Sequence, residues 1–340
     1  MKINKLLLNL SAVYVLLSFM LFSCKDQKTV EPQFLEGNAF GTTFHITYFD
    51  NSGRDFTLQV DSLFNMVNKS LSTYIPNSDI SKINCGDTTV VTDAYFREVF
   101  NKSNRIYRET DGIFDPTIGI LVNAWGFGPE KRESLPDSAE VKHLLTMVGF
   151  DKVRLEHNKV EKEYDSIYFD FNAIAKGYAV DVAGRYLESS GIANYLVEIG
   201  GEIRAKGENL AKEKPWVIGI ETPNFDGTRS LQKKIQFTDE SIATSGNYRK
   251  YKTDSLTGRR YMHILDTKTG YPSQTNLLSV SVMANLDCAD VDGYATAIMA
   301  MPLNRAQTFF KDHPNLKGYI IYNDKDNNLQ TWSTANFEGF

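Results

Sequence analysis

The segment FDFNAIAKGYAVD, residues 169–181, places a carboxylate and a lysine within one short run of small residues. Asp170 lies between Phe169 and Phe171 at the end of a predicted strand, and Lys176 follows among alanines and a glycine. Small residues let a ligand or another backbone come close to the chain. A carboxylate and a cation beside such a gap are suited to bind a polar ligand, such as a phosphate or an adenine. Spacing alone leaves a second interpretation open, in which a solvated lysine follows a tight strand-to-helix turn.

A second pair of oxygen-bearing side chains lies in ADVDGYATAIMAM, residues 289–301. Asp292 and Thr296 are four residues apart, so they share one face of the predicted helix. Carboxylate and hydroxyl oxygens are ligands that suit a hard cation such as Mg²⁺. From these residues alone we favour the alternative, in which Asp292 caps the helix and Thr296 bonds back to a backbone carbonyl.

His263 lies in YMHILD, three residues before Asp266. Its unperturbed pKa is near neutral, which suits a general base, but a histidine among apolar residues is more often a buried structural residue. The five histidines show no zinc-ligand spacing. The chain also lacks a Gly-x-Ser-x-Gly motif, which argues against a serine hydrolase.

These residues lie in turn-rich segments between predicted helices and strands. Apolar spacing predicts five helices, the second of them with Thr92 as its cap, over residues 56–71, about 96–107, 174–190, 289–301 and 303–312. Residue types and alternation predict strands over 40–49, 196–199, 202–205, 216–221 and 277–284. Residues 241–251 are predicted to form a loop. The chain has neither a regular βαβ alternation nor a Gly-x-Gly-x-x-Gly motif, so the sequence does not indicate a Rossmann domain.

The N-terminus has the features of a secretory signal. Two early lysines precede an apolar run from Leu6 to Phe22, and Cys24 follows a serine, as in a bacterial lipobox. We therefore expect a signal peptide over 1–23, a polar tether over 24–36 and a domain over 37–340, anchored by lipid on Cys24. An uncleaved membrane anchor is the alternative. Both place the domain outside the cytoplasm, at the periplasmic face of a membrane.

The net charge bears on nucleic-acid binding, and the cysteines bear on disulfide formation. Removing the signal peptide would take away Lys2 and Lys5 and no acids, which changes the net charge of −5 to −7. Without a basic run, nucleic-acid binding is not expected. Cys85 and Cys288 are the other two cysteines, and they are either paired in an oxidising compartment or free.

Seven segments occur in the order and spacing of the ApbE family, the FAD:protein FMN transferases. They are GTTFHITY, LSTYIPNSDISKIN, DGIFDPTIGILVNAWGFG, FDFNAIAKGYAVD, ATSGNYRKY, RYMHILDTKTGYP and ADVDGYATAIM. The resemblance covers about residues 36–335. It implies an α+β fold, with a T-fold-related core of sheet and helices and a smaller lobe over an FAD cleft. The implied reaction is the Mg²⁺-dependent transfer of FMN from FAD to a threonine hydroxyl of a partner protein, with release of AMP.

The resemblance also implies roles for single residues. Asp170 would bind the adenine amino group and Lys176 would contact FAD. Mg²⁺ would be held by Asp292, Thr296 and the backbone carbonyl of Ala173, which reverses the capping interpretation. The other positions that match FAD contacts are Phe40, Tyr74, Ile113, Phe114, Asp115 and Leu265.

The chain departs from the family's usual residues at Phe40, Ile113 and Asn172, where Met, Ala, and Ser or Gly are common. A neutral threonine hydroxyl is a poor nucleophile, so we expect His263 to take its proton, with activation by the metal as the rival account.

The resemblance implies membrane redox subunits as acceptors, such as those of a Na⁺-pumping quinone reductase or an Rnf-type complex.

Two other functions stay open. One is FAD pyrophosphatase activity that yields AMP and FMN, and the other is a flavin-binding lipoprotein without catalysis. Lys25 rather than Asp follows Cys24, so the sequence does not decide between the inner and the outer membrane.

Overall fold

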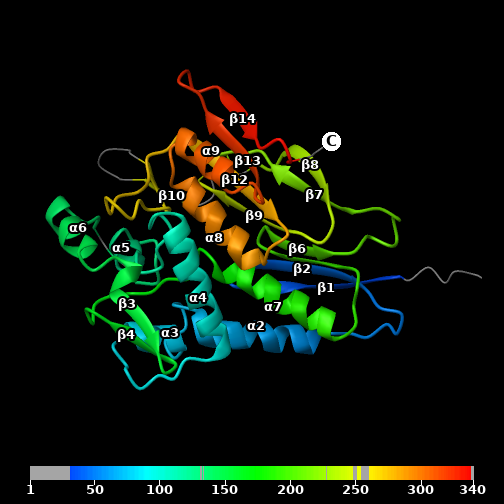
Figure 1. Cartoon of the computed structure of the whole chain (residues 1–340), viewed down its shortest axis with the longest axis horizontal. Helices are drawn as coiled ribbons and strands as arrows, with labels where there is room; N and C mark the ends of the chain where they lie inside the picture. The colour runs from blue at the N-terminus through cyan, green and yellow to red at the C-terminus, as the bar shows by residue number, and fades with distance from the viewer. Residues whose placement is uncertain are drawn as a thin grey trace, which may run out of the picture.

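Figure 1 shows a computed structural model, which describes residues 31–130, 132, 134–226, 228–247, 251–253 and 260–337. Its centre is an eight-stranded sheet with the strand order β1-β2-β5-β6-β9-β12-β13-β14, in which every neighbouring pair is antiparallel. The eight strands are β1 (Pro32–Ala39), β2 (Thr42–Phe49), β5 (Tyr195–Ile199), β6 (Glu202–Lys206), β9 (Ser241–Gly246), β12 (Leu277–Ala284), β13 (Lys317–Asn323) and β14 (Leu329–Ser333). With its helices, this sheet confirms the predicted α+β class.

Helices and three small hairpins complete the part of the chain that is described. The helices are α2 (Thr57–Leu71), α3 (Asp79–Asn84), α4 (Ala94–Glu109), α5 (Gly119–Ala124), α6 (Ser138–Leu145), the short 3-10 helix η1 (Phe150–Lys152), α7 (Ala175–Ser189), α8 (Cys288–Met299) and α9 (Leu303–Asp312). The hairpins are β3 (Val153–Glu156) with β4 (Lys159–Lys162), β7 (Trp216–Glu221) with β8 (Leu231–Phe237), and β10 (Tyr251–Thr253) with β11 (Arg260–Met262). None of the helices described has the length and hydropathy to cross a membrane.

The sheet is covered on both faces. Helix α7 packs on β5 and β6, and α8 packs on β6, β9 and β12. Helices α2 and α4 form a further layer, since α2 contacts α7 and α4 contacts α8 (Figure 1). The other face packs against the β7–β8 hairpin through a separate apolar cluster that includes Ile203, Trp216 and Ile235. Successive side chains of a strand point to opposite faces of the sheet, so each strand contributes apolar residues to both of these layers.

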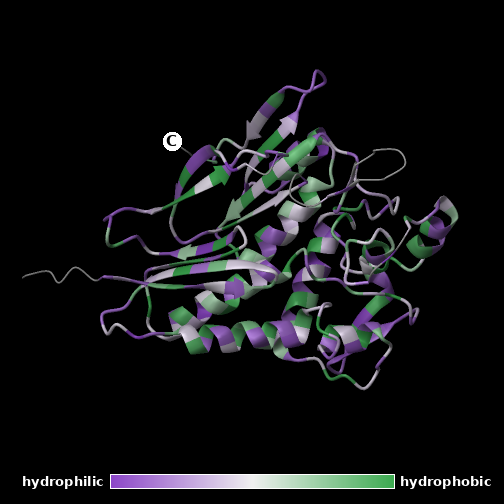
Figure 2. Ribbon diagram, turned by 180° about the vertical axis from the view of Figure 1, so that it is seen from behind, coloured by the Kyte–Doolittle hydropathy of each residue, from purple (hydrophilic) through white to green (hydrophobic). Residues whose placement is uncertain are grey.

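Helix α2 shows how the sequence pattern sets this packing. Val60, Phe64, Val67 and Leu71 recur at helical spacing and are buried. Figure 2 shows purple and green residues mixed along this helix, as expected when one face meets the core and the other meets water.

Helices α7 and α8 approach each other closely at Gly177. A Cβ at this position would lie 2.5 Å from the Cys288 carbonyl oxygen, so only glycine fits here. Asp181 of α7 caps the neighbouring helix, because its carboxylate accepts the backbone N–H groups of Cys288 at 2.8 Å and Ala289 at 2.9 Å. Capping of α8 by Asp292, the interpretation from the residues alone, is therefore wrong.

A network of ion pairs ties this contact to the rest of the fold. Arg204 of β6 pairs with Asp181, at 2.9 Å, and with Asp287, at 2.9 Å. Asp287 also pairs with Lys102 of α4 at 2.8 Å and with Arg185 of α7 at 2.7 Å. One carboxylate at the start of α8 thus joins three other elements.

The structure corrects three expectations. Strand β1 begins at Pro32, so residues 32–36, expected as the end of the tether, pair with β2. The cap of α4 is Asp93, which accepts the Phe96 N–H at 2.8 Å, and not Thr92. Residues 241–246 form the central strand β9 and not a loop.

The sequence did not predict strand β9 because the segment is rich in small and hydroxyl residues, which are also common in loops. The hydroxyl of Thr244 pairs with that of Ser281 on β12 at 2.8 Å, so a polar residue is satisfied inside the sheet.

Cys85 is an exposed free thiol and Cys288 a buried one, so of the two alternatives the structure shows free cysteines. The predicted signal peptide and Cys24 lie outside the described residues.

Candidate active site

A charged cluster lies where the first turn of α7 meets α8 and β6, with both carboxylates buried and the Lys176 side chain 32% exposed. The Lys176 ammonium pairs with Glu202, the first residue of β6, at 2.6 Å. Asp292 of α8 is 3% exposed, and its carboxylate accepts the Gly177 N–H at 3.1 Å. Two helices and the sheet therefore bring one cation and two carboxylates together.

Burial sets the protonation of this cluster. It raises the pKa of Asp292 to about 8, and Glu202 adds to the shift while Lys176 opposes it. Burial also raises the pKa of Glu202, although Lys176 opposes this. Burial lowers the pKa of Lys176, but Glu202 and Asp292 more than compensate, so this pKa lies above its usual value. Another cation at the cluster would favour the ionised carboxylates.

The oxygen atoms around Asp292 suit a hard cation. Thr296 lies one turn further along α8, and its hydroxyl is 3.2 Å from that of Ser245 on β9. Ala173 lies in the turn just before α7, whose first turn contains Gly177. Within the described ranges, no three His, Cys, Asp or Glu side chains form a metal-binding group. A cation here would therefore depend on the hydroxyl and on backbone oxygen for its other protein ligands, a donor set that fits Mg²⁺.

Asp170 lies in the turn that leads into α7. Its carboxylate accepts the Asn172 N–H at 2.7 Å, and its own N–H donates to the Pro116 carbonyl at 2.8 Å. The ring of Tyr74 is half exposed, and its pKa is raised by burial and by the charge of Asp170. An aromatic ring and an anchored carboxylate are suited to bind a nucleobase.

Phe40 occupies a strained turn. It links β1 to β2 together with Gly41, with φ of 53° at Phe40 and 75° at Gly41. Bulky residues rarely adopt positive φ, and such outliers often occur at functional sites. The Phe40 ring packs edge-on against Phe64 at 5.4 Å and remains partly exposed.

The three positions 113–115 have different surroundings. Ile113 is partly exposed, whereas Phe114 is 3% exposed in the main core. Asp115 accepts the N–H and the hydroxyl of Thr117, at 2.8 and 2.6 Å, and the Phe150 N–H at 3.2 Å. Burial raises its pKa to about 6. The Asp115 carboxylate therefore holds its own loop in shape.

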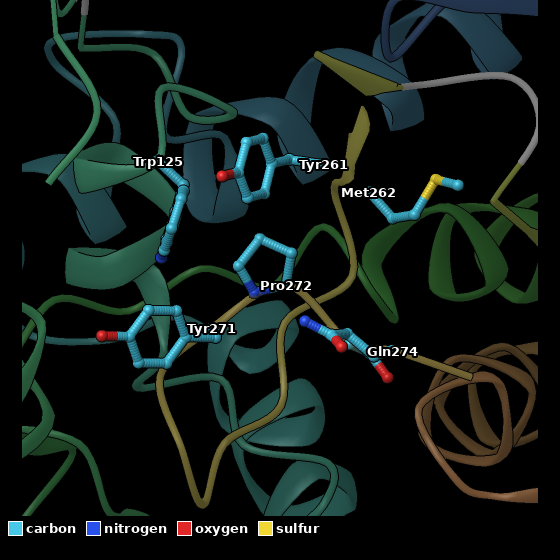
Figure 3. Close-up of a pocket in the computed structure, with 7 residues that line it drawn as sticks. Trp125, Tyr261, Met262, Tyr271, Pro272 and Gln274 are labelled. Atoms are coloured by element: carbon cyan, nitrogen blue, oxygen red, sulfur yellow. The ribbon is translucent and has the colours of Figure 1, made fainter. Parts of the chain in front are cut away.

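An aromatic pocket is lined by residues that precede and follow His263 in sequence, but not by His263 itself. Figure 3 shows this cavity, of about 270 Å³, lined by Trp125, Tyr261, Met262, Tyr271, Pro272, Ser273 and Gln274. The Trp125 indole donates to the Gly270 carbonyl at 2.9 Å, which fixes the ring. His263 follows Met262 directly, is partly exposed and meets the Phe127 ring edge-on at 6.4 Å. Leu265 is buried, and its backbone bridges to Pro272.

Some of the predicted residues fall into two groups. Lys176, Asp292 and Thr296 lie on α7 and α8, and Ala173 lies in the turn that precedes α7. His263 and Leu265 belong to the loop around the aromatic pocket, whose lining includes neither Lys176 nor Asp292.

Sequence reasoning missed Glu202, Asp181 and Ser245. Glu202 follows two glycines in IGGEIRAKG, and a single acid at the start of an apolar strand was the available signal.

The chain resembles known proteins over nearly its whole length. Its sequence matches the ApbE family over residues 40–320. It is 36% identical to an FAD:protein FMN transferase of Haemophilus influenzae, over 98% of each chain. It is 35% identical to one of Vibrio cholerae, over 96% of this chain and 98% of the relative.

Solved structures give the same result. The flavin transferase ApbE from Vibrio cholerae superposes with a TM-score of 0.81 at 35% identity, covering 91% of this chain and 98% of that one. The apo form of the Pseudomonas stutzeri flavinyl transferase ApbE superposes with a TM-score of 0.80 at 27% identity, covering 91% and 96%.

Proposed function

The chain belongs to the ApbE family, and from this premise we propose that it is an FAD:protein FMN transferase. The observation that carries the proposal is the cluster of Lys176 with the buried carboxylates Glu202 and Asp292, formed within a fold shared with flavin transferases. A cation and metal-binding oxygens at one point are what the cleavage of a pyrophosphate requires, because phosphoryl transfer depends mainly on positioning and on neutralising charge.

FAD would bind across the turn before α7. Asp170 and Tyr74 are suited to hold the adenine, and Lys176 to approach the phosphates. The strained Phe40 turn and Ile113 offer partly exposed apolar surface to the flavin or the adenine. Asp115 and Phe114 support this site by shaping the loop, since their side chains are buried in contacts with the protein.

Mg²⁺ would be held by Asp292, Thr296 and the Ala173 carbonyl. When bound, it supplies neutralisation of the charge on the pyrophosphate oxygens. The protein's own contribution is to keep Asp292 in place through the Gly177 N–H and to keep Thr296 one helical turn away.

The transfer forms one P–O bond and breaks another. The hydroxyl oxygen of the acceptor, which we take to be a threonine, attacks the phosphorus of the FMN half, and the anhydride bond to the AMP half breaks. His263 would accept the hydroxyl proton, and AMP leaves. The partly exposed position of His263, next in sequence to Met262 of the aromatic pocket, supports this role because an acceptor from another protein must reach it.

The site of action follows from the N-terminal sequence. We propose that Cys24 carries lipid and that the domain faces the periplasm. The acceptors would then be flavin-carrying redox subunits at that membrane, such as those of a Na⁺-pumping quinone reductase or an Rnf-type complex.

The proposal is tested with FAD, Mg²⁺ and an acceptor domain carrying the family's Ser/Thr-Gly-Ala-Ser/Thr type of sequence. We expect mass spectrometry to find FMN covalently bound to the acceptor threonine, with one AMP released per adduct. The matched control is the acceptor with threonine replaced by alanine, which should gain no adduct. AMP and free FMN without adduct would instead establish hydrolysis, and no AMP at all would indicate a flavin-binding protein.

A further inference from the structure

Glu202 is a buried carboxylate to which the proposed reaction gives no part. It begins β6, is 3% exposed, and holds the Lys176 ammonium at 2.6 Å through Oε1. Its second oxygen, Oε2, is fully buried and has no hydrogen-bond partner among the described residues. A buried carboxylate oxygen without a hydrogen-bond partner lowers the stability of the fold, so we look for a functional role of Glu202.

Lys176 lies within electrostatic reach of two carboxylates. Asp292 and Glu202 both raise the pKa of Lys176, and Lys176 lowers the pKa of each in return. In the part of the chain that the structure describes, its ion pair is with Glu202 and not with Asp292. The Asp292 carboxylate instead accepts a single backbone N–H, from Gly177. The lysine is therefore held on one of two possible partners.

We propose that Glu202 is a positioning residue that holds the Lys176 ammonium away from Asp292 and so keeps the Asp292 carboxylate open to a divalent cation. This inference rests on the proposed function, in which Asp292 binds that cation. The flexible lysine side chain makes such a choice of partner possible.

The consequence of losing Glu202 follows from the attraction between the lysine and the carboxylate that remains. Without its partner, the ammonium would turn to Asp292, the other buried carboxylate beside it. A cation would then have to displace the lysine before it could bind. Cation affinity would fall even though no cation ligand had been removed.

A competing explanation is that the negative charge of Glu202 attracts the cation directly. The two accounts differ in whether the effect passes through Lys176, so a double-mutant cycle separates them. The variants are Glu202→Gln, Lys176→Gln and the double variant. Each keeps a side chain able to form hydrogen bonds.

The experiment measures Mn²⁺ binding by electron paramagnetic resonance, without FAD or acceptor. We expect Glu202→Gln to weaken Mn²⁺ binding by at least about tenfold, or about 1.4 kcal/mol. In the Lys176→Gln background, the same substitution should change the affinity by less than about threefold. Equal weakening in both backgrounds, or unchanged affinity in Glu202→Gln, would overturn the inference.

Two further variants keep the outcome clear. Asp292→Asn should abolish Mn²⁺ binding. If Asp292→Asn still binds Mn²⁺, the proposed cation site itself is wrong. If Asp292→Asn loses Mn²⁺ binding and Glu202→Gln does not weaken it, only the role of Glu202 is contradicted. Should Glu202→Gln fail to fold by circular dichroism, Glu202→Asp takes its place in the cycle. It keeps the charge but draws the carboxylate back, and we expect it to weaken Mn²⁺ binding only when Lys176 is present.

Discussion

Asp292 and Asp115 are both buried aspartates, but their surroundings give them different uses. Asp115 accepts hydrogen bonds from Thr117 and Phe150, which satisfy it within the protein. Among the described residues, Asp292 accepts one backbone N–H, and burial raises its pKa further, to about 8 compared with about 6 for Asp115. A carboxylate with so few donors has oxygen atoms available for a cation.

His263 gives the first prediction at this scale. His263→Ala should lower the rate of FMN transfer at least about 100-fold, the usual contribution of a general base. FAD affinity should change little, because the proton is taken only during transfer. The measurements are kcat for adduct formation and the FAD Kd from flavin fluorescence. Parallel losses in both would mark His263 as a packing residue.

Asp287 gives a prediction about stability and pH. Burial alone would raise its pKa, but Lys102, Arg185 and Arg204 outweigh burial and lower it from 3.8 to about 2. Since the folded-state pKa is depressed, the stabilisation is present above about pH 4 and is lost as the pH falls toward 2. Asp287→Asn should reduce the free energy of unfolding at pH 7 by about 2 kcal/mol.

Urea unfolding from pH 7 to pH 3 checks this. The difference between wild type and Asp287→Asn should shrink as the pH falls below 4. A difference that stays constant over this range would show that the ion pairs of Asp287 do not stabilise the fold.

Single residues also mark the limit of sequence reasoning. Asp170, Lys176, Asp292 and Thr296 were identified because they lie in motifs whose order matches a family. Glu202 was not, because its partner Lys176 is on another element, and only the packing of α7 on β6 brings the two charges together.

At the scale of elements, helices were easier to predict than strands. Residues 56–71, 174–190 and 303–312 correspond closely to α2, α7 and α9, since apolar spacing over several turns is a strong signal. Strand β9 was predicted as a loop because its Ser, Thr and Gly residues resemble a turn. Cross-strand hydroxyl pairing stabilises it, and a single sequence does not show this pairing.

The contact between α7 and α8 is the element on which the site depends. Gly177→Ala would place a methyl group 2.5 Å from the Cys288 carbonyl oxygen, and backbone atoms there cannot easily move aside. We expect the free energy of unfolding to fall by about 1–3 kcal/mol, as for other overpacked sites. Transfer activity should fall as well, because the Gly177 N–H holds Asp292.

Gly184→Ala, on the same helix, is the matched control. Its methyl group would lie 2.9 Å from the Tyr195 hydroxyl and 3.0 Å from the Arg204 side chain, so it would crowd side chains and not the backbone of α8. Thermal unfolding and transfer rate are measured for both variants. If Gly177→Ala is as stable and active as Gly184→Ala, the close helix contact does not position the site.

At the scale of the whole molecule, the site depends on distant parts of the chain meeting. Gly177 and Asp292 are 115 residues apart in sequence. The strand order β5-β6-β9-β12 brings Glu202 and Ser245 beneath α7 and α8. Such convergence follows from topology, which the resemblance to a family implied but the local patterns did not.

The proposed lipid anchor at Cys24 gives a prediction about where the whole molecule acts. Cys24→Ser should remove the lipid attachment site, so that the protein becomes soluble or remains as an unprocessed precursor. Membrane fractionation followed by immunoblotting measures this. A membrane fraction equal to that of the wild type would favour an uncleaved anchor over a lipid.

The central claim is that FMN transfer takes place at the cluster around Asp292, and one comparison tests it most directly. The initial rate of covalent FMN attachment to an acceptor domain is measured by mass spectrometry for wild type, Asp292→Asn and Asp290→Asn. Asp290 is the matched control, since it is equally buried on the same helix but pairs with Lys102 and Arg105. The account predicts a loss of at least about 100-fold for Asp292→Asn alone, on the scale of one removed electrostatic contribution to catalysis. Attachment by Asp292→Asn at the wild-type rate would contradict it.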